Sequence, residues 1–161
     1  MKENRDKTNA MRILERAGVG FRVLFYEAAD GAIDGVSVAH KVNVPEERVC
    51  KTLVTAGHSR EHYVFVIPVG RELDLKKAAK SVGEKSVEMI HVADINRVTG
   101  YIRGGCSPVG MKKAFATRID GSVRDFAEIL VSGGRIGTQI ALAPLDLARV
   151  SGAEFADLTQ K

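Results

Sequence analysis

The sequence predicts a single mixed α+β domain, with a mixed β-sheet or partly closed, barrel-like core and helices packed on it. Pairs of apolar runs joined by short turn segments indicate antiparallel hairpins rather than the crossovers of a doubly wound parallel sheet. Short segments with helical periodicity lie between these runs. The length of 161 residues suits one domain, expected over 8–158, with tails at 1–7 and 159–161.

The first half of the chain predicts two helices and three strands. In chain order, they are a helix over 9–17, a strand over 21–27, a helix over 37–42, and strands over 49–56 and 62–69. Thr8 or Asn9 can cap the first helix, and Gly18 and Gly20 end it. The first strand alternates its apolar residues between two faces. The turn residues 57–61 join the last two strands and predict an antiparallel hairpin.

The second half predicts short helices and strands around two glycine-rich loops. In chain order, they are a helix over 75–83, a strand over 86–90, a helix over 93–98, a loop over 100–114, a strand over 115–119, a helix over 122–128, a strand over 128–132, a loop over 133–138, a strand over 139–143 and a helix from Pro144. Asp74 caps the first of these helices and Gly83 ends it. Hairpins and helices therefore occur together throughout the chain.

Composition argues against several kinds of site and compartment. Cys50 and Cys106 form no CxxC pair, so we expect neither a thiolate zinc site nor a disulfide framework. Residues 1–10 are too charged for a secretion signal, and no apolar run approaches the ~18 residues of a membrane span. We therefore expect a cytoplasmic protein with no membrane partner. The net charge of +4 permits a polyanionic partner without requiring one.

The segment from His58 to His62 reads HSREH and matches the H-x-x-E-H pattern of one metalloprotease group. That chemistry needs a helix, because residues four apart then share a face and both imidazoles reach one zinc ion. Here the motif lies on a predicted hairpin turn. We therefore expect a solvated turn and no metal.

Residues 105–109 read GCSPV, which is one residue short of the G-x-S-x-G nucleophile elbow. Val109 replaces the second glycine, and Pro108 removes a backbone N–H that an oxyanion hole beside Ser107 would use. None of the four histidines is marked by its context as a base. Cys106 could be a thiolate nucleophile among basic neighbours, or a small residue that fills space beside the loop, and we favour the second.

Both glycine-rich loops are candidate backbone cradles. Gly104 and Gly105 permit positive φ angles, and their N–H groups could bind an ester carbonyl oxygen as it gains negative charge. A second loop, SGGRIG over 132–137, repeats this arrangement with Arg135 beside it. Neither loop is a Walker A or G-x-G-x-x-G motif, so a nucleoside triphosphate or dinucleotide site is disfavoured.

Lys51 is the most informative single residue. It alternates with Val49 and Leu53 along a predicted strand, so its side chain points to the same face as two apolar ones. If that face is buried, the lysine must be paired or functional. If the face meets water, it is an ordinary strand lysine. Periodicity alone leaves both interpretations open.

Four segments, in this order and spacing, closely resemble the YbaK/EbsC family of free-standing aminoacyl-tRNA editing domains. They are RVCKTLV, DLKKAAKSVGEKSVEM, TGYIRGGCSPVGMKK and ILVSGGRIGTQIALAPLDLARVSGAEFADL. The family is related to the insertion domain of bacterial prolyl-tRNA synthetases, and the chain looks nearest to its Cys-tRNA(Pro) deacylase branch. The resemblance implies the barrel-like mixed fold, tRNA as substrate, no metal or cofactor, and leaves prolyl-tRNA synthetase open as a partner.

The resemblance also implies roles for residues at matching motif positions. It implies a catalytic set of Lys51, Gly104 and Ser132. It implies substrate-binding roles for Tyr26, Thr52, Gly105, Pro108, Gly133, Gly134 and Arg135. Lys51 would hold a phosphate or carbonyl oxygen, and Thr52 and Ser132 would add polar contacts. Candidate phosphate contacts along the CCA end are Arg103, Lys112, Lys113 and Arg135.

In the Cys-specific branch, the resemblance implies that the cysteinyl thiol attacks its own carbonyl and leaves as a cyclic thioester. Three alternatives stay open: editing of Ala- or Ser-charged tRNA by water, a non-catalytic tRNA- or synthetase-binding module, and a hydrolase that uses Cys106. Two residues depart from the family pattern. Cys106 stands where an aliphatic residue is usual and could alter amino-acid choice. Ile136 stands where a second basic residue is usual and could weaken a phosphate contact.

Overall fold

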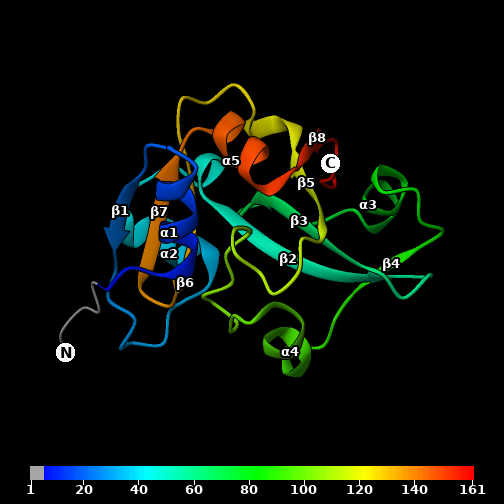
Figure 1. Cartoon of the computed structure of the whole chain (residues 1–161), viewed down its shortest axis with the longest axis horizontal. Coiled ribbons are helices and arrows are strands. Elements are labelled where there is room, and N and C mark those ends of the chain that lie inside the picture. The colour runs from blue at the N-terminus through cyan, green and yellow to red at the C-terminus, as the bar shows by residue number, and fades with distance from the viewer. Residues whose placement is uncertain (1–5) are drawn as a thin grey trace.

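Two β-sheets form the centre of the protein in a computed structural model that describes residues 6–161 (Figure 1). The first has the strand order β1 (Arg22–Phe25), β7 (Thr138–Leu142), β6 (Ile129–Arg135). The second has the order β4 (Val87–Met89), β2 (Cys50–Gly57), β3 (His62–Pro68), β5 (Ala116–Asp120), β8 (Glu154–Ala156). A bridge between Val49 and Leu130 joins the sheets. β3 pairs with β5, and β5 with β8, in parallel, while the other named pairs are antiparallel. The predicted mixed fold is confirmed.

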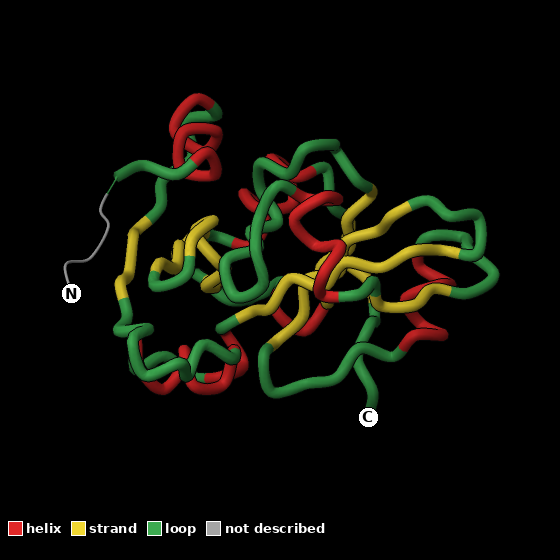
Figure 2. The backbone as a smooth tube through the Cα atoms, turned by 90° about the horizontal axis from the view of Figure 1, so that it is seen from below, coloured by secondary structure: helices red, strands yellow, loops and turns green. Residues whose placement is uncertain are grey.

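Short helices surround the two sheets (Figures 1 and 2). The α-helices are α1 (Asn9–Arg16), α2 (Gly35–Val42), α3 (Leu75–Ser81), α4 (Ile95–Thr99) and α5 (Pro144–Ser151). Single 3-10 turns lie at η1 (Glu46–Arg48), η2 (Val92–Asp94) and η3 (Gly121–Val123). The predicted caps Thr8 and Asp74 each accept a hydrogen bond from a backbone N–H in the first turn, and Asp34 does the same for α2.

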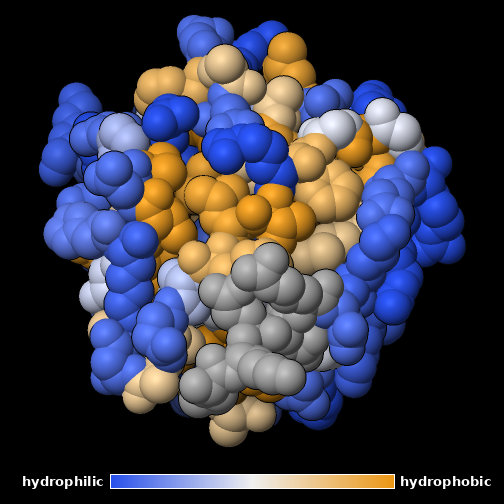
Figure 3. All heavy atoms as spheres, turned by 90° about the vertical axis from the view of Figure 1, so that its left-hand side faces the viewer, coloured by the Kyte–Doolittle hydropathy of each residue, from blue (hydrophilic) through white to orange (hydrophobic). Residues whose placement is uncertain are grey.

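Apolar clusters on both faces of the larger sheet hold these elements together. One cluster joins α1, α5 and both sheets through residues such as Leu14, Ile119, Ile140 and Leu147. A second cluster, around Phe65, packs α3 on the opposite face, because neighbouring strand residues point to opposite sides. On the face that carries α1 and β1, apolar side chains reach the surface between hydrophilic borders (Figure 3).

Two sequence-based expectations about elements were wrong, and one element was not predicted. The predicted loop 133–138 is largely strand: β6 continues to Arg135 through a bulge, which accommodates the glycines, and only the tight turn to β7 remains. The predicted helix 122–128 is a 3-10 turn, held because the Asp120 carboxylate accepts hydrogen bonds from Ser122. The short strand β8 was not predicted, because its three residues give no pattern.

The ends of the chain bear on two further expectations. Most of the predicted tail 1–7 lies outside the described residues. Thr159, the first residue of the predicted tail 159–161, pairs with Leu73. Within residues 6–161, none of the helices has the length and apolar character needed to cross a membrane.

Candidate functional site

A cavity of about 720 Å³ lies where the two sheets meet, and we call it the Lys51 cavity. Its walls come from the end of β1, the loop before α2, the start of β2, the loop after α4, and strands β6 and β7. Five predicted site residues line it together: Tyr26, Lys51, Thr52, Gly104 and Ser132. Segments up to about a hundred residues apart in sequence thus contribute to one site.

The other five predicted site residues do not line this cavity. They are Gly105, Pro108, Gly133, Gly134 and Arg135. The N–H of Gly105 donates to the carbonyl of Ile102 at 2.9 Å, and the N–H of Gly134 donates to Ser132 Oγ at 3.2 Å. Both amides already donate hydrogen bonds within the protein, and this argues against a role for them as donors to an oxyanion. Arg135 donates from Nη2 to the carbonyl of Asp6, so it ties the hairpin to the segment before α1.

Gly104 and Gly105 explain how the two predicted loops meet. Gly104 has φ +84°, which favours glycine, and a Cβ there would lie 2.9 Å from Ile33 Cδ1. A Cβ at Gly105 would lie 3.0 Å from the backbone nitrogen of Ile136, which cannot move aside easily. The missing side chain at Gly105 therefore lets the loop after α4 pack directly on the β6–β7 turn, and the missing side chain at Gly104 leaves room for Ile33 from the loop before α2.

Lys51 is half-buried and lines the cavity, which answers the question that periodicity left open. Its side chain makes no hydrogen bond or ion pair within the described residues. The other charged groups on the cavity wall are Arg103 and Asp34. Asp34 is engaged as the cap of α2, because it accepts from Ser37 Oγ at 2.6 Å and from the Ser37 N–H at 3.2 Å. The cavity wall thus carries two positive charges and one carboxylate that is already hydrogen-bonded. This charge balance favours an anionic ligand.

Three buried polar atoms on the cavity wall have no hydrogen-bond partner: Tyr26 Oη, Thr52 Oγ1 and Gln139 Oε1. An unpaired buried polar group costs about 1–3 kcal/mol, so such groups mark sites that a ligand completes. Gln139 is only 6% exposed, and the sequence analysis missed it. Its one signal was a polar residue at the head of the apolar run QIALA.

The predicted nucleophiles are poorly placed for attack. Burial raises the pKa of the Cys106 thiol to about 11, although a hydrogen bond to Thr99 opposes the shift. The thiol is therefore protonated at neutral pH. Ser107 is fully buried, and its Oγ accepts from the N–H of Val109. Residues 100–103 form no strand, so the strand that a nucleophile elbow requires is missing.

The HSREH segment lies on the β2–β3 turn and the first residue of β3, as the sequence predicted. His58 and His62 therefore do not share a helix face. Across residues 6–161, no group of three or more His, Cys, Asp or Glu side chains could hold a metal ion. The metalloprotease interpretation has no geometric support.

Lys41 fixes the loop before α2, which forms part of the wall of the Lys51 cavity. Its Nζ donates to the carbonyl oxygens of Glu27 at 2.6 Å and Ala32 at 3.0 Å, and pairs with Asp30 Oδ1 at 2.7 Å. The same ammonium lies 6.0 Å from the centre of the Tyr26 ring. One side chain thus holds both ends of the loop and contacts the aromatic ring that lines the cavity.

Comparison with known proteins decides the family. Residues 32–150 match the aminoacyl-tRNA editing domain family. The chain belongs to this family. It is 42% identical over 160 residues, 99% of its length and 98% of the relative's, to an Enterococcus faecalis protein provisionally named Cys-tRNA(Pro)/Cys-tRNA(Cys) deacylase EbsC. The predicted family and the predicted enzyme class, an aminoacyl-tRNA deacylase, are confirmed.

Other known proteins share part of the sequence or the fold of this chain. A proline–tRNA ligase of Brachyspira hyodysenteriae is 24% identical over 98 residues, which cover 61% of this chain and 17% of the ligase. A crystal structure described as a provisional trans-editing enzyme for prolyl-tRNA synthetase superposes with a TM-score of 0.83 and 25% identity, over 95% of this chain and 96% of that one. The protein APE2540 shares the fold, with a TM-score of 0.86 and 22% identity over 95% of this chain and all of that one.

Proposed function

We propose that this editing domain clears cysteine from mischarged tRNA(Pro), and that it does so in the Lys51 cavity. The proposal rests on one observation. The cavity holds the unpaired ammonium of Lys51 and polar atoms without hydrogen-bond partners, but no side-chain base next to a side-chain nucleophile. An aminoacyl ester is already reactive, so a protein can cleave it by positioning it and stabilising the developing oxyanion. The 42% identity to the protein named EbsC supports cysteine as the amino acid.

The nucleophile in this proposal is the thiol of the substrate. The cysteinyl sulfur attacks the carbonyl carbon of its own ester and forms a C–S bond as its proton departs. The bond from that carbon to the 3′ oxygen of the terminal adenosine then breaks, and this oxygen takes up a proton. The products are tRNA with a free 3′ hydroxyl and a cyclic thioester of cysteine.

The residues of the cavity have separate tasks in this reaction. The Lys51 ammonium holds the carbonyl oxygen or the neighbouring phosphate, where negative charge must be balanced. Thr52 and Ser132 contribute hydroxyl groups to the cavity wall, and Tyr26 offers a phenol with no protein partner. Arg103, on the loop after α4, adds a second positive charge for the tRNA backbone.

The proposal is tested by incubating the purified protein with tRNA(Pro) charged with Cys, Ala or Ser and following the ester bond. Rapid discharge of Cys-tRNA(Pro), with slow discharge of the other two, supports the self-attack reaction. Ala lacks a side-chain nucleophile, so fast discharge of Ala-tRNA(Pro) would require water as the attacking group. Binding of tRNA with no discharge of any substrate would instead support a non-catalytic module.

A further inference from the structure

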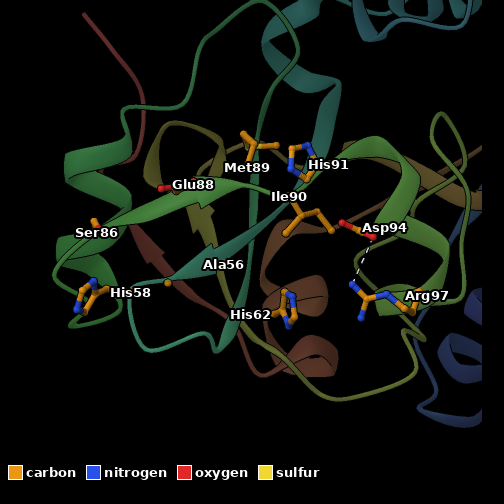
Figure 4. A pocket seen from close by; sticks show the side chains of 11 residues that line it. Ala56, His58, His62, Ser86, Glu88, Met89, Ile90, His91, Asp94 and Arg97 are labelled. Atoms are coloured by element: carbon orange, nitrogen blue, oxygen red, sulfur yellow. Dashed lines mark ion pairs between the residues drawn. The ribbon is translucent and has the colours of Figure 1, made fainter.

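A second hollow, of about 460 Å³, lies between β2, β4 and α4 (Figure 4). We call it the His62 groove. Its lining residues are Ala56, Gly57, His58, His62, Ser86, Glu88, Met89, Ile90, His91, Asp94 and Arg97. It shares no lining residue with the Lys51 cavity, and its volume is within the range of small-ligand sites.

The register of the sheet explains the centre of the groove. Ala56 on β2 pairs with His62 on β3 and with Glu88 on β4, so the three side chains lie on one face of the sheet. Alanine is small, and it leaves an open floor between a ring and a carboxylate. The two outer strands are about 10 Å apart, because neighbouring strands are spaced by ~4.8 Å. A flat aromatic ring has room to enter there.

The chemistry of the groove fits a nucleotide. His62 contacts Phe115 edge to face, with ring centres 5.7 Å apart, and this contact fixes the orientation of the imidazole. Rings of this kind stack on unpaired bases. The exposed Glu88 carboxylate is an acceptor that can pair with the amino group of cytosine. Arg97 lies at the end of the groove, and its guanidinium keeps donors for a phosphate beyond its 3.4 Å contact with Asp94 (Figure 4).

The position of the groove fits the path of a tRNA end. Thr52 in the Lys51 cavity and Ala56 in the groove lie on the same face of β2, because an even number of residues separates them. Four residues of strand span about 13 Å. The two cytidines of the CCA end lie one and two nucleotides from the terminal adenosine, so an unstacked, extended strand is needed to cover that distance. The segment 94–106 contributes to both sites, so it runs alongside such a path.

We propose that the His62 groove binds a cytidine of the single-stranded CCA end, while the aminoacylated adenosine occupies the Lys51 cavity. The base stacks on His62, its amino group donates to Glu88, and its phosphate contacts Arg97. This inference rests on the proposed function for the identity of the RNA. It adds a second subsite that reads base identity, separate from the polar groups of the Lys51 cavity.

Binding of a fluorescent, uncharged RNA minihelix tests the subsite without requiring catalysis. Wild-type protein is expected to bind a minihelix ending in CCA about tenfold more tightly than a version with uridine in place of the cytidine two nucleotides from the terminal adenosine, the one that reaches the groove. His62→Ala is expected to weaken binding of the CCA end about tenfold. Glu88→Gln is expected to reduce the preference for cytidine over uridine, because an amide can pair with either base. Glu72→Gln, at an exposed residue outside both sites, is the matched control.

The results distinguish failure of the cytidine site from failure of the proposed deacylase function. If uridine is tolerated by wild type, or if His62→Ala and Glu88→Gln bind like Glu72→Gln, the groove is not a cytidine site. A thermal unfolding curve guards against misfolding of the His62 variant, and Glu88 is exposed enough to be changed freely. If the minihelix pattern holds but no charged tRNA is discharged, the cytidine site stands and the proposed deacylase function fails.

Discussion

Gln139 lies directly opposite Ser132 in the β6–β7 hairpin, and both side chains line the Lys51 cavity. Directly opposed strand residues point to the same face of a sheet, so the pair forms one polar wall. Ser132 is engaged by the N–H of Gly134, whereas Gln139 Oε1 has no partner. The wall therefore presents one unused acceptor to whatever occupies the cavity.

The first prediction concerns this acceptor. Gln139→Met replaces the amide with an apolar group of similar size, and so removes a buried oxygen that no protein group satisfies. We expect the free energy of unfolding to rise by about 1 kcal/mol, while discharge of Cys-tRNA(Pro) falls. Chemical denaturation and the deacylation assay measure the two effects. A variant that is less stable but fully active would show that Gln139 serves the fold and not the ligand.

The second prediction concerns the part of the cavity wall that the loop before α2 forms. Lys41→Met removes the three contacts that hold the loop 27–34, and we expect kcat/KM to fall about tenfold because the wall is no longer held in place. Hydrogen exchange of the amides at 27–34 should become faster. Lys76→Met, at an exposed lysine of α3, is the control. Faster exchange with unchanged kcat/KM would mean that the loop does not position substrate.

The third prediction concerns Cys106. Burial raises the pKa of the Cys106 thiol to about 11, so the thiol is protonated at pH 7. Alkylation of Cys106 by iodoacetamide should therefore be slow at pH 7 and accelerate up to about pH 11. Cys106→Ser should retain the deacylation rate, because the substrate supplies the reacting sulfur. A large loss of activity in this variant would restore the thiol-dependent hydrolase as an explanation.

Much of the fold followed from local patterns. The β2–β3 hairpin and the helix caps Thr8 and Asp74 were predicted because apolar alternation, turn residues and capping side chains act over a few positions. The extension of β6 through Gly133 and Gly134 was not predicted. Its pairing with β7 across a bulge offsets the poor strand preference of glycine, and that pairing is a tertiary contact.

Part of the site was predicted from the sequence, and there is a physical reason why the rest was not. Lys51 and Thr52 stand out within one motif, and the structure brings them to the same cavity as Gly104. Gly105 looked like a cradle residue because glycine loops expose amides, yet its N–H is used in a turn. Little in the sequence indicated Gln139, because whether a buried oxygen has a hydrogen-bond partner depends on neighbours from other strands.

Lys51 is the residue on which the account depends most. Single-turnover discharge of Cys-tRNA(Pro) by Lys51→Ala, compared with wild type and with Lys80→Ala at an exposed site, tests its role directly. We expect a rate at least about 100-fold lower for Lys51→Ala, with an unchanged unfolding midpoint, and a normal rate for Lys80→Ala. Discharge by Lys51→Ala at the wild-type rate would contradict it.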